Sequence, residues 1–304
     1  EQNSEDFDVV LLHNINPVFS WNKISENIKI FLTFHTTYFG YYSKLNHKLF
    51  RIYYKYMTKL EQKRLTDMNN KATFIGVSET TCDELSSQGV DKKNIRCISN
   101  GVDINRFKPN NSKSQLRNQL DFPLDGLLFL SIGRISAQKN LFNLLEVFKY
   151  AQTLREDIIL IIAGTGELLQ DLRLFAQKNN LKNIKFLGHV KEQDLPKLYA
   201  SADFFIISSK YEGQPLTLLE AMASGLPCIV SNIPNLDVVK DANCGIVIDF
   251  DDRKDAAEKI LRYIASDLPS IHSTNARNYA EKNLSWEGVS IKYLKEFTNS
   301  EDNL

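Results

Sequence analysis

The sequence lacks three features that would narrow the class of protein at once. Lysine plus arginine and aspartate plus glutamate both number 37 among the 304 residues, so no excess charge favours nucleic acid as a partner. No stretch approaches the roughly 20 apolar residues that are needed to span a bilayer. Cysteine occurs only four times, without the spacing of a metal site, so we expect reduced thiols in a cytoplasmic protein.

Short apolar runs alternate with helical patterns from about residue 125 onward. The runs cover residues 127–132, 158–163, 184–187, 204–207, 228–230 and 245–248. They are apolar on both faces, as strands of a buried parallel sheet are, and apolar residues between them recur at helical spacing. Strand and helix repeated in this way predict a doubly wound α/β domain.

The first hundred residues carry a shorter version of the same pattern. Strands are expected at residues 8–13, 28–35, 72–78 and 95–99. Four strands are fewer than a complete doubly wound domain has, so we expect an incomplete one. The polar stretch 108–119 is interpreted as a linker. The predicted boundaries are therefore a partial domain over 1–108, a second domain over 109–285 and a last helix over 286–304.

The most informative stretch is 208–227, directly after a predicted strand. Pro215 stands where a first helical residue would, and Gly225 stands just past the end of the helix. The amides of Leu216 and Thr217 have no partner within such a helix. With a helix dipole of about half a positive charge behind them, they form an anion site.

Two glutamates, Glu212 and Glu220, flank the start of this predicted helix. A carboxylate accepts two hydroxyl hydrogen bonds at once, and such charge-assisted bonds are strong. The pair and its strand–loop–proline–helix frame resemble the paired-glutamate motif of retaining glycosyltransferase family 4. The resemblance implies that Glu212 holds a hydroxyl of the donor sugar and Glu220 the ribose of the nucleotide. The resemblance also implies that the donor site includes Gly213, Gln214, Pro215, Leu216 and Thr217.

A second loop agrees with this family. Gly133, Arg134 and Lys139 follow the strand 127–132 and resemble the family's phosphate-gripping loop. Two cations there would stabilise the negative charge that builds on the diphosphate as the glycosidic bond breaks. The alternative is a solvated loop with ordinary surface charges. The family's loop for the nucleotide base is matched by Gly188, His189 and Val190.

Gly164 and Gly166 follow another strand and suggest a dinucleotide-binding loop. The third glycine of that fingerprint is absent, because Leu169 stands in its place. The resemblance instead makes this loop a lining of the nucleotide side of the cleft.

The N-terminal part matches the family with fewer residues. His35 ends a strand and resembles the histidine that faces the donor sugar, but Thr36 stands where an acidic residue is usual, and a strand-end histidine is more often structural. The family's N-terminal glycine-rich loop has no counterpart before residue 100, so we expect the chain to begin near the middle of that domain. Trp286 resembles the start of the C-terminal helix that returns to the N-terminal domain.

The resemblance implies a GT-B fold, with two doubly wound Rossmann-like domains facing a cleft. It implies a glycosyltransferase that moves a sugar from a nucleotide-diphosphate donor to an acceptor hydroxyl with retention of configuration. We expect a UDP-sugar rather than a GDP- or ADP-sugar, no cofactor and no metal. We also expect a carbohydrate or lipid-linked acceptor, in polysaccharide or glycolipid biosynthesis.

Two alternatives stay open. A non-catalytic GT-B subunit is favoured by the missing glycine-rich loop and opposed by the intact cations and glutamates. An epimerase or phosphorylase of the same fold is the other, although no lysine context indicates the pyridoxal group of a phosphorylase.

The segment 41–64 holds seven basic residues against one acidic residue, Glu61. The basic residues are Lys44, Lys48, Arg51, Lys55, Lys59, Lys63 and Arg64. A neighbouring apolar stripe comprises Leu45, Leu49, Ile52, Tyr56 and Leu60. A basic amphipathic helix of this kind can lie on anionic lipid, which would place the protein on the cytoplasmic face of a membrane. The alternative is a helix that packs its apolar stripe against the protein and leaves its lysines in water.

Overall fold

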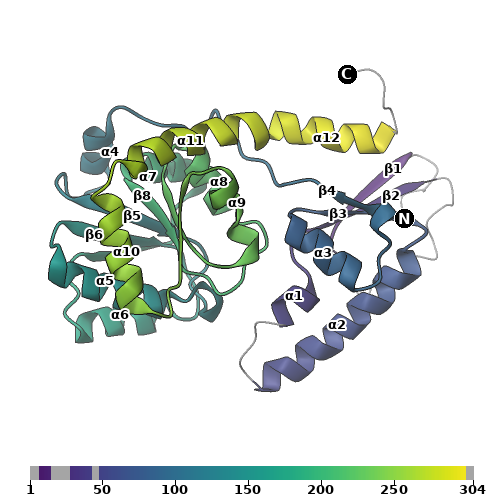
Figure 1. The fold of residues 1–304 in the computed structure, drawn as a ribbon, viewed down its shortest axis with the longest axis horizontal. Helices are drawn as coiled ribbons and strands as arrows, with labels where there is room; N and C mark the ends of the chain where they lie inside the picture. Colours follow the sequence, from purple (N-terminus) through teal and green to yellow (C-terminus); the bar gives the residue numbers. More distant parts are fainter. Residues whose placement is uncertain (1–6, 15–27, 43–47, 299–304) are drawn as a thin grey trace. The chain divides into compact units, whose positions relative to one another are not determined.

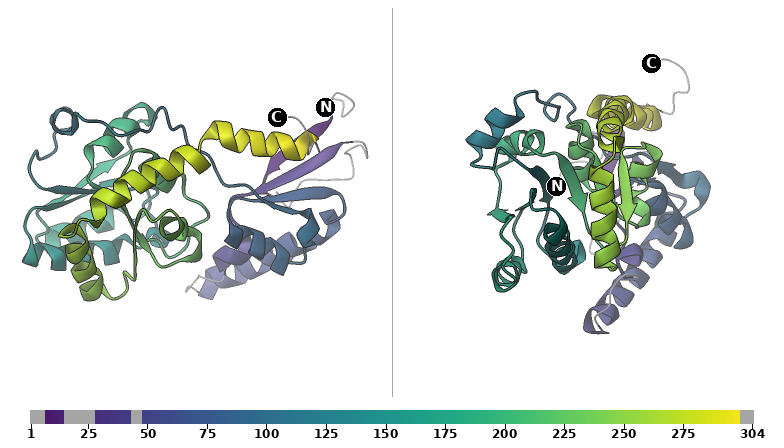
Figure 2. Two further views of the ribbon diagram at one scale, coloured as in Figure 1. Left: turned by 45° about the horizontal axis from the view of Figure 1, so that its top comes forward. Right: turned by 60° about the vertical axis from the view of Figure 1, so that its left-hand side comes forward.

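The computed structural model describes residues 7–14, 28–42 and 48–298 (Figure 1). The chain forms two compact units. Unit 1 comprises Glu1–Asn100, Glu212–Gln214 and Glu287–Leu304, and unit 2 comprises Gly101–Tyr211 and Pro215–Trp286. Each unit has a parallel sheet with helices on both faces (Figure 2). The predicted α/β class, with two Rossmann-like domains, is confirmed.

The sheet of unit 2 has six parallel strands in the order β10-β9-β8-β5-β6-β7. The strands are β5 (Leu127–Ile132), β6 (Ile158–Ala163), β7 (Ile184–Gly188), β8 (Phe204–Ile207), β9 (Cys228–Ser231) and β10 (Gly245–Ile248). After β5 the chain adds strands on one side, and from β8 onward it adds them on the other. The order therefore reverses between β5 and β8, which lie next to each other.

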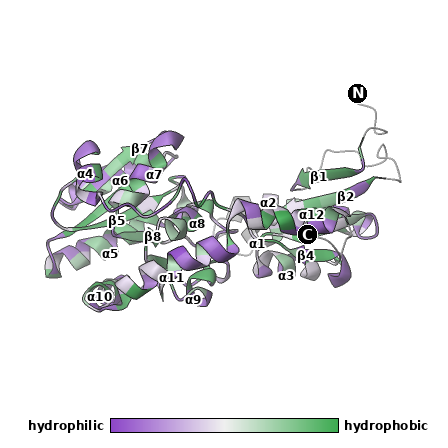
Figure 3. Ribbon diagram, turned by 90° about the horizontal axis from the view of Figure 1, so that it is seen from above, coloured by the Kyte–Doolittle hydropathy of each residue, from purple (hydrophilic) through white to green (hydrophobic). Residues whose placement is uncertain are grey.

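Helices cover both faces of this sheet. They are α4 (Lys113–Gln119), α5 (Leu141–Leu154), α6 (Leu169–Lys178), α7 (Leu195–Ser201), α8 (Leu216–Ala223), α9 (Val238–Asp241), α10 (Arg253–Ile264) and α11 (Leu268–Asn283). Residues of α7, α8 and α11 share one hydrophobic core with the sheet, and residues of α5, α6 and α10 share the other. Figure 3 shows the resulting contrast between hydrophobic strands and helices of mixed polarity. Because β6 is buried along its whole length, its uniformly apolar sequence is explained.

Short 3-10 helices occur in both units. They are η3 (Lys92–Asn94), η4 (Ala137–Lys139), η5 (Glu192–Asp194) and η6 (Pro234–Leu236).

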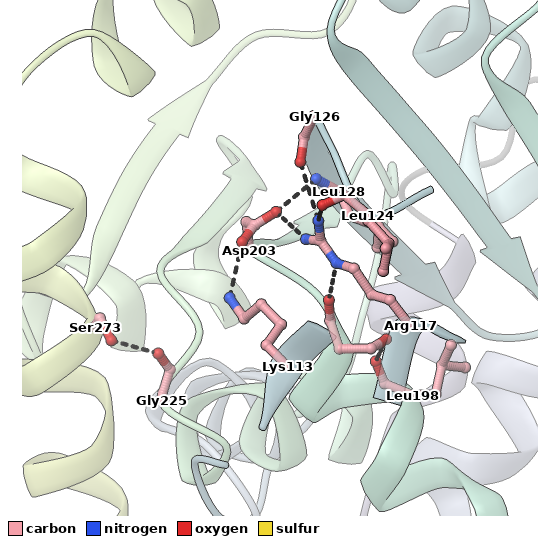
Figure 4. A network of polar contacts seen from close by, with 10 residues as sticks. Lys113, Arg117, Leu124, Gly126, Leu128, Leu198, Asp203, Gly225 and Ser273 are labelled. Atoms are coloured by element: carbon pink, nitrogen blue, oxygen red, sulfur yellow. Dashed lines mark hydrogen bonds and ion pairs between the residues drawn. The ribbon is translucent and has the colours of Figure 1, made fainter. Parts of the chain in front are cut away.

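The interpretation of 108–119 as a linker was wrong, because Lys113–Gln119 forms α4. Its Arg117 is only 4% exposed. The guanidinium pairs with Asp203, which also accepts from Lys113 Nζ at 2.8 Å (Figure 4). It donates further hydrogen bonds, at 3.0–3.1 Å, to the carbonyl oxygens of Ser201, Leu124 and Gly126. Polar composition concealed the packed helix because its central polar side chain finds all these partners inside the unit.

Unit 1 has four parallel strands in the order β1-β2-β3-β4. They are β1 (Val9–His13), β2 (Lys29–Phe34), β3 (Ala72–Gly76) and β4 (Ile95–Cys97). Its helices are α1 (Tyr38–Tyr42), α2 (Lys48–Met68), α3 (Glu79–Ser87) and α12 (Trp286–Thr298). The Ser78 hydroxyl accepts from Thr81 N–H at 3.1 Å and forms the N-cap of α3.

The two faces of this sheet are covered by different parts of the chain. Leu65 of α2 and Leu85 of α3 lie in one core with β2 and β3. Val289 of α12 lies in the opposite core, with Phe31 and Ile75. The helix that Trp286 opens therefore completes the second face of a sheet whose last strand ends at Cys97.

Candidate functional site

The reversal of strand order creates a crevice at the carboxyl ends of β5 and β8. The chain leaves β5 toward α5 on one face and leaves β8 toward α8 on the other. In open α/β sheets ligands bind where neighbouring connections diverge in this way. A pocket opens at this point, lined from the β5 side by Gly133, Arg134 and Lys139 and from the β8 side by Ser208 and Ser209.

Hydrogen bonds tie the two walls of this pocket together. The backbone carbonyl of Gln138 accepts from the Lys210 N–H at 2.9 Å, and the Gln138 side-chain amide donates to the Tyr211 carbonyl at 2.7 Å. The Ser208 hydroxyl donates to the Lys139 carbonyl at 2.8 Å. The loops after β5 and β8 are thereby held in one arrangement before any ligand arrives, which lowers the reorganisation that binding requires.

The two predicted cations lie in this pocket. Gly133 has φ of 153°, and a Cβ built on it would lie 3.3 Å from Lys139 Cε and 3.5 Å from Nζ, so the lysine side chain passes over the glycine backbone. Arg134 is 77% exposed and pairs with Glu167 at 3.6 Å. An exposed pair of this kind contributes at most about 1 kcal/mol, so a multivalent anion in the pocket can compete for Arg134.

Gly164 and Gly166 have a packing role beside this pocket. A Cβ on Gly164, whose φ is 137°, would lie 1.9 Å from the Gly133 carbonyl oxygen, and one on Gly166 would lie 2.1 Å from that of Ile135. Ile135 N–H in turn donates to the Thr165 carbonyl at 2.8 Å. The loop after β6 therefore supports the β5 loop through backbone contacts that only glycine permits.

The start of α8 is the predicted source of free backbone amides for an anion. The helix begins at Leu216, one residue later than predicted, with Pro215 as its N-cap. Backbone pairing starts at Leu218, whose N–H donates to the Pro215 carbonyl at 3.0 Å. This pattern agrees with the prediction that the amides of Leu216 and Thr217 are not used within the helix.

Glu220 lies in α8 with its carboxylate partly buried. Its Oε2 accepts from the Tyr199 hydroxyl at 2.7 Å. Burial raises the pKa of Glu220, while the Tyr199 hydrogen bond and the positive charge of Arg106 oppose the rise. Arg106 also forms an ion pair at 2.8 Å with Glu192, directly after the loop that begins with Gly188.

The loop predicted to hold the base follows β7. Gly188 has φ of 69°, and a Cβ built on it would meet nothing within 4 Å. His189 is exposed and Val190 is half-buried. The Arg106 guanidinium also donates to the Glu192 carbonyl, which holds the chain just after this loop.

The remaining predicted residues belong to unit 1. Glu212 is buried, Gly213 is buried and Gln214 is half-buried, and all three group with the N-terminal unit, as His35 does. His35 Nε2 lies 3.0 Å from His13 Nδ1. Burial lowers the pKa of His35, His13 lowers it further, and a hydrogen bond with the Asn100 side chain opposes both.

Several functional candidates were missed from the sequence. In the sequence Tyr199 looks like one apolar position of a helix. Its hydroxyl contact with Glu220 depends on how α7 and α8 pack together. His13 could have been found, because it and His35 end two predicted neighbouring strands. Ser208 and Ser209 also carried a signal, since they stand directly after the strand at the reversal point.

Two features are absent from the part of the chain that the structure describes. No group of three or more histidine, cysteine, aspartate or glutamate side chains is placed to hold a metal ion. No described helix is both long and apolar enough to cross a membrane.

Family models match nearly the whole chain. The model for "Glycosyl transferases group 1" matches residues 112–283, and the model for "Glycosyltransferase Family 4" matches residues 2–106. Together they span the described strands of both units.

Individual relatives agree. A UDP-Gal:alpha-D-GlcNAc-diphosphoundecaprenol alpha-1,3-galactosyltransferase of Escherichia coli is 32% identical over 253 residues, which are 80% of this chain and 63% of that protein. An alpha-monoglucosyldiacylglycerol synthase of Streptococcus pneumoniae is 35% identical over 53% of this chain and 37% of its own length. The chain thus spans less than two thirds of either relative.

Among solved structures, Anabaena HepE in complex with UDP and glucose superposes with a TM-score of 0.75 at 17% identity. The match covers 90% of this chain and 72% of HepE. At this identity the likeness establishes the fold.

Proposed function

The chain belongs to the glycosyl transferases group 1 family, and from this membership we propose that it moves a sugar from a nucleotide-diphosphate donor to an acceptor hydroxyl. We propose retention of anomeric configuration. The observation that carries the proposal is the pocket at the reversal of strand order in unit 2, where Arg134 and Lys139 lie together. Two cations beside a glycine turn suit a diphosphate better than any neutral ligand.

Each part of the donor has a proposed partner. Arg134 and Lys139 hold the diphosphate, assisted by the amides of Leu216 and Thr217, and each charge-assisted bond contributes about 1.5–3 kcal/mol. Glu220 accepts from the ribose hydroxyls. The base lies at Gly188, His189 and Val190. The donor sugar is assigned to Glu212, Gly213 and Gln214, preceding Pro215, and the acceptor side to His35.

The chemistry requires stabilisation of a departing nucleoside diphosphate. As the bond between the anomeric carbon and the phosphate oxygen breaks, its electron pair passes to that oxygen, which gains negative charge. The acceptor oxygen forms the new bond to the anomeric carbon, and its proton passes to the departing diphosphate, which has gained the electron pair. In this proposal Lys139 and Arg134 offset that growing charge, since positive groups already present at the site lower the barrier with little reorganisation during the reaction.

Relatives support a UDP-sugar and a lipid-linked acceptor. The Escherichia coli relative is named for UDP-galactose and a diphosphoundecaprenol acceptor, and the Streptococcus relative is named for a diacylglycerol lipid. HepE was solved with UDP. We therefore place the reaction in polysaccharide or glycolipid biosynthesis.

The exposed face of α2 supports contact with a membrane surface. Ile52, Tyr53 and Tyr56 are 71%, 53% and 61% exposed, so two residues of the predicted apolar stripe, Ile52 and Tyr56, are open to solvent, whereas Leu60 is half-buried. Exposed lysines interleave with them, namely Lys55, Lys59 and Lys63. Lys44 and Leu45 lie outside the described residues, as do the side chains of Lys48, Leu49 and Arg51. Apolar side chains among basic ones suit anionic lipid on the cytoplasmic face of a membrane.

The transfer reaction is tested with radiolabelled UDP-sugars and a lipid-linked acceptor, and the anomeric configuration of the product is read by NMR. We expect one UDP-sugar to give product with the donor's configuration, and the Lys139→Ala variant to form product about 10²–10³-fold more slowly. Nucleotide binding without transfer to any acceptor would instead favour a non-catalytic subunit. An inverted product would contradict the retaining mechanism.

The membrane contact is tested by sedimentation with vesicles of phosphatidylcholine alone or mixed with phosphatidylglycerol. We expect binding only to the anionic vesicles, weakened by salt and lost when Lys55, Lys59 and Lys63 are changed to glutamate. A matched control changes three exposed lysines elsewhere in unit 1, namely Lys71, Lys92 and Lys93. Equal loss in both variants, or binding that ignores salt, would contradict a specific role for α2.

A further inference from the structure

We propose that Tyr199 is a positioning residue that aims the carboxylate of Glu220 at the ribose of the donor nucleotide. The inference rests on the function proposed above, since it concerns the same nucleotide site. It adds a residue that never touches the ligand and acts only through Glu220.

Packing around the ring of Tyr199 restricts the position of its hydroxyl. The side chain is fully buried in α7, and its ring packs edge-to-face on Phe107 at 5.5 Å and tilted on Phe205 at 5.8 Å. These contacts fix the ring, so the hydroxyl is directed at α8. It lies 2.7 Å from Glu220 Oε2 and 3.2 Å from the Thr217 carbonyl oxygen. A hydroxyl has one hydrogen, and the nearer, charged acceptor is the stronger one.

This hydrogen bond gives the two oxygens of the Glu220 carboxylate different roles. Oε2 is held by a rigid, buried donor, so the side chain cannot choose freely among its rotamers. Oε1 and the remaining lone pairs are left for other donors, because a carboxylate accepts about four hydrogen bonds. A vicinal diol such as the ribose 2′- and 3′-hydroxyls offers two donors at the required separation. Fixing one oxygen in advance removes part of the ordering cost of binding.

Tyr199 also favours the charged form of Glu220. Burial alone would favour the protonated acid, which is a poor acceptor for two hydroxyls. The Tyr199 hydrogen bond and the charge of Arg106 lower the pKa of Glu220, whereas the nearby Glu192 raises it. Removal of the hydroxyl should therefore let the carboxyl protonate at a higher pH than in the unchanged protein.

The competing explanation is that Tyr199 only fills the core. Tyr199→Phe separates the two, because it keeps the ring and its packing and removes one oxygen. A matched control exists in the same unit. Tyr263 is 4% exposed, and its hydroxyl lies 2.8 Å from Nδ1 of the buried His272, so Tyr263→Phe removes a comparable buried hydrogen bond away from Glu220.

The experiment measures binding of UDP and of 2′,3′-dideoxy-UDP by calorimetry, for the unchanged protein and both variants, from pH 5.5 to 8.5. We expect Tyr199→Phe to weaken UDP binding about 10-fold or more, as loss of one charge-assisted contact does. Dideoxy-UDP binding should be unaffected, since that ligand has no ribose hydroxyls for Glu220. The acid limb of UDP affinity should move to higher pH in Tyr199→Phe alone. Titration of the ligand's own phosphate is common to all three proteins and cancels in the comparison.

Each failure has a separate meaning. Equal weakening of UDP and dideoxy-UDP by Tyr199→Phe would overturn the positioning role and leave a structural one, as would the same weakening in Tyr263→Phe. Unchanged UDP binding in Tyr199→Phe would overturn it as well, with the proposed donor site intact. An unchanged protein that binds none of UDP, GDP and ADP would overturn the proposed function and the inference together.

Discussion

The two sheets of this protein follow the same alternation of strand and helix but place their polar groups differently. In unit 2 the strand order reverses between β5 and β8, and the candidate site lies at that reversal. Among the described strands of unit 1 the order runs from β1 to β4 without a reversal. In unit 1 the polar contacts lie instead after β2. There the Thr37 hydroxyl donates to Glu84 and the Tyr38 amide donates to Glu61.

The difference extends to buried charge. In unit 2 the buried Arg117 is paired with Asp203 and three carbonyl oxygens. In unit 1 the buried Glu61 accepts from the amides of Tyr38 at 2.9 Å and Phe39 at 3.4 Å, and a second carboxyl, Glu84, lies nearby. Burial raises the pKa of Glu61 to about 7, and the charge of Glu84 adds to the rise. Unit 2 thus balances its buried charge with an opposite one, whereas Glu61 titrates close to neutral pH.

The largest expected effect lies in the pocket of unit 2. Lys139→Ala should lower turnover about 10²–10³-fold, and Arg134→Ala similarly, because each removes a fixed positive charge from the departing diphosphate. Steady-state kinetics with the UDP-sugar checks this. Arg173→Ala, an exposed arginine of α6, serves as control and should stay near full activity. Near-full activity in Lys139→Ala would remove that residue from the proposed role.

The next effect concerns the stability of unit 2. Arg117→Met should lower the free energy of unfolding by about 3 kcal/mol, because buried carbonyls and Asp203 lose their donor. Hydrogen exchange of β5 and β8 amides reads unit 2 separately from unit 1. Lys113→Met tests the exposed partner of the same aspartate and should cost under about 1 kcal/mol. Equal costs would mean that burial is not what distinguishes the two cations.

A smaller effect, with a pH dependence, is expected in unit 1. The folded unit binds the Glu61 proton more tightly than the unfolded chain does, so this stabilisation is full below about pH 4.5 and is lost as pH rises through about 7. The loss should amount to about 2–3 kcal/mol between pH 5 and pH 8. Glu61→Gln keeps an oxygen for the Tyr38 and Phe39 amides and should flatten the profile.

Hydrogen exchange of β2 and β3 amides across pH measures this, with Asp67→Asn on the exposed side of α2 as control. If Glu61→Gln leaves the pH profile unchanged, the contrast in buried charge between the two units is wrong.

The smallest effect belongs to the exposed pair of Arg134 and Glu167. Glu167→Gln should change stability by less than about 0.5 kcal/mol, because both side chains are more than half exposed. UDP affinity should rise about twofold, since Arg134 no longer has a competing carboxylate. Calorimetry detects such a change. A fall in affinity would show that Glu167 holds Arg134 in place for the ligand.

The strands and the main loops could be predicted from the sequence because their signals are local. Short, mainly apolar runs marked most of the described strands within a few residues, and Gly133, Lys139 and Glu220 stood at recognisable offsets from strand or helix ends. What could not be predicted depends on contacts between distant segments. Arg117 looked like part of a polar linker because its partners lie up to 86 residues away. Tyr199 was missed for the same reason, since its hydroxyl acceptor is in another helix.

The central claim is that the reversal point of unit 2 binds a nucleoside diphosphate. The most direct test is thermal unfolding of the unchanged protein and Glu220→Ala with UDP, GDP or ADP. At 100 times its dissociation constant, a bound nucleotide adds about 2.7 kcal/mol of stability. We predict a raised Tm of unit 2 with UDP and a much smaller shift in Glu220→Ala at the same concentration. No shift with any of the three nucleotides, or an equal shift in both proteins, would contradict the account.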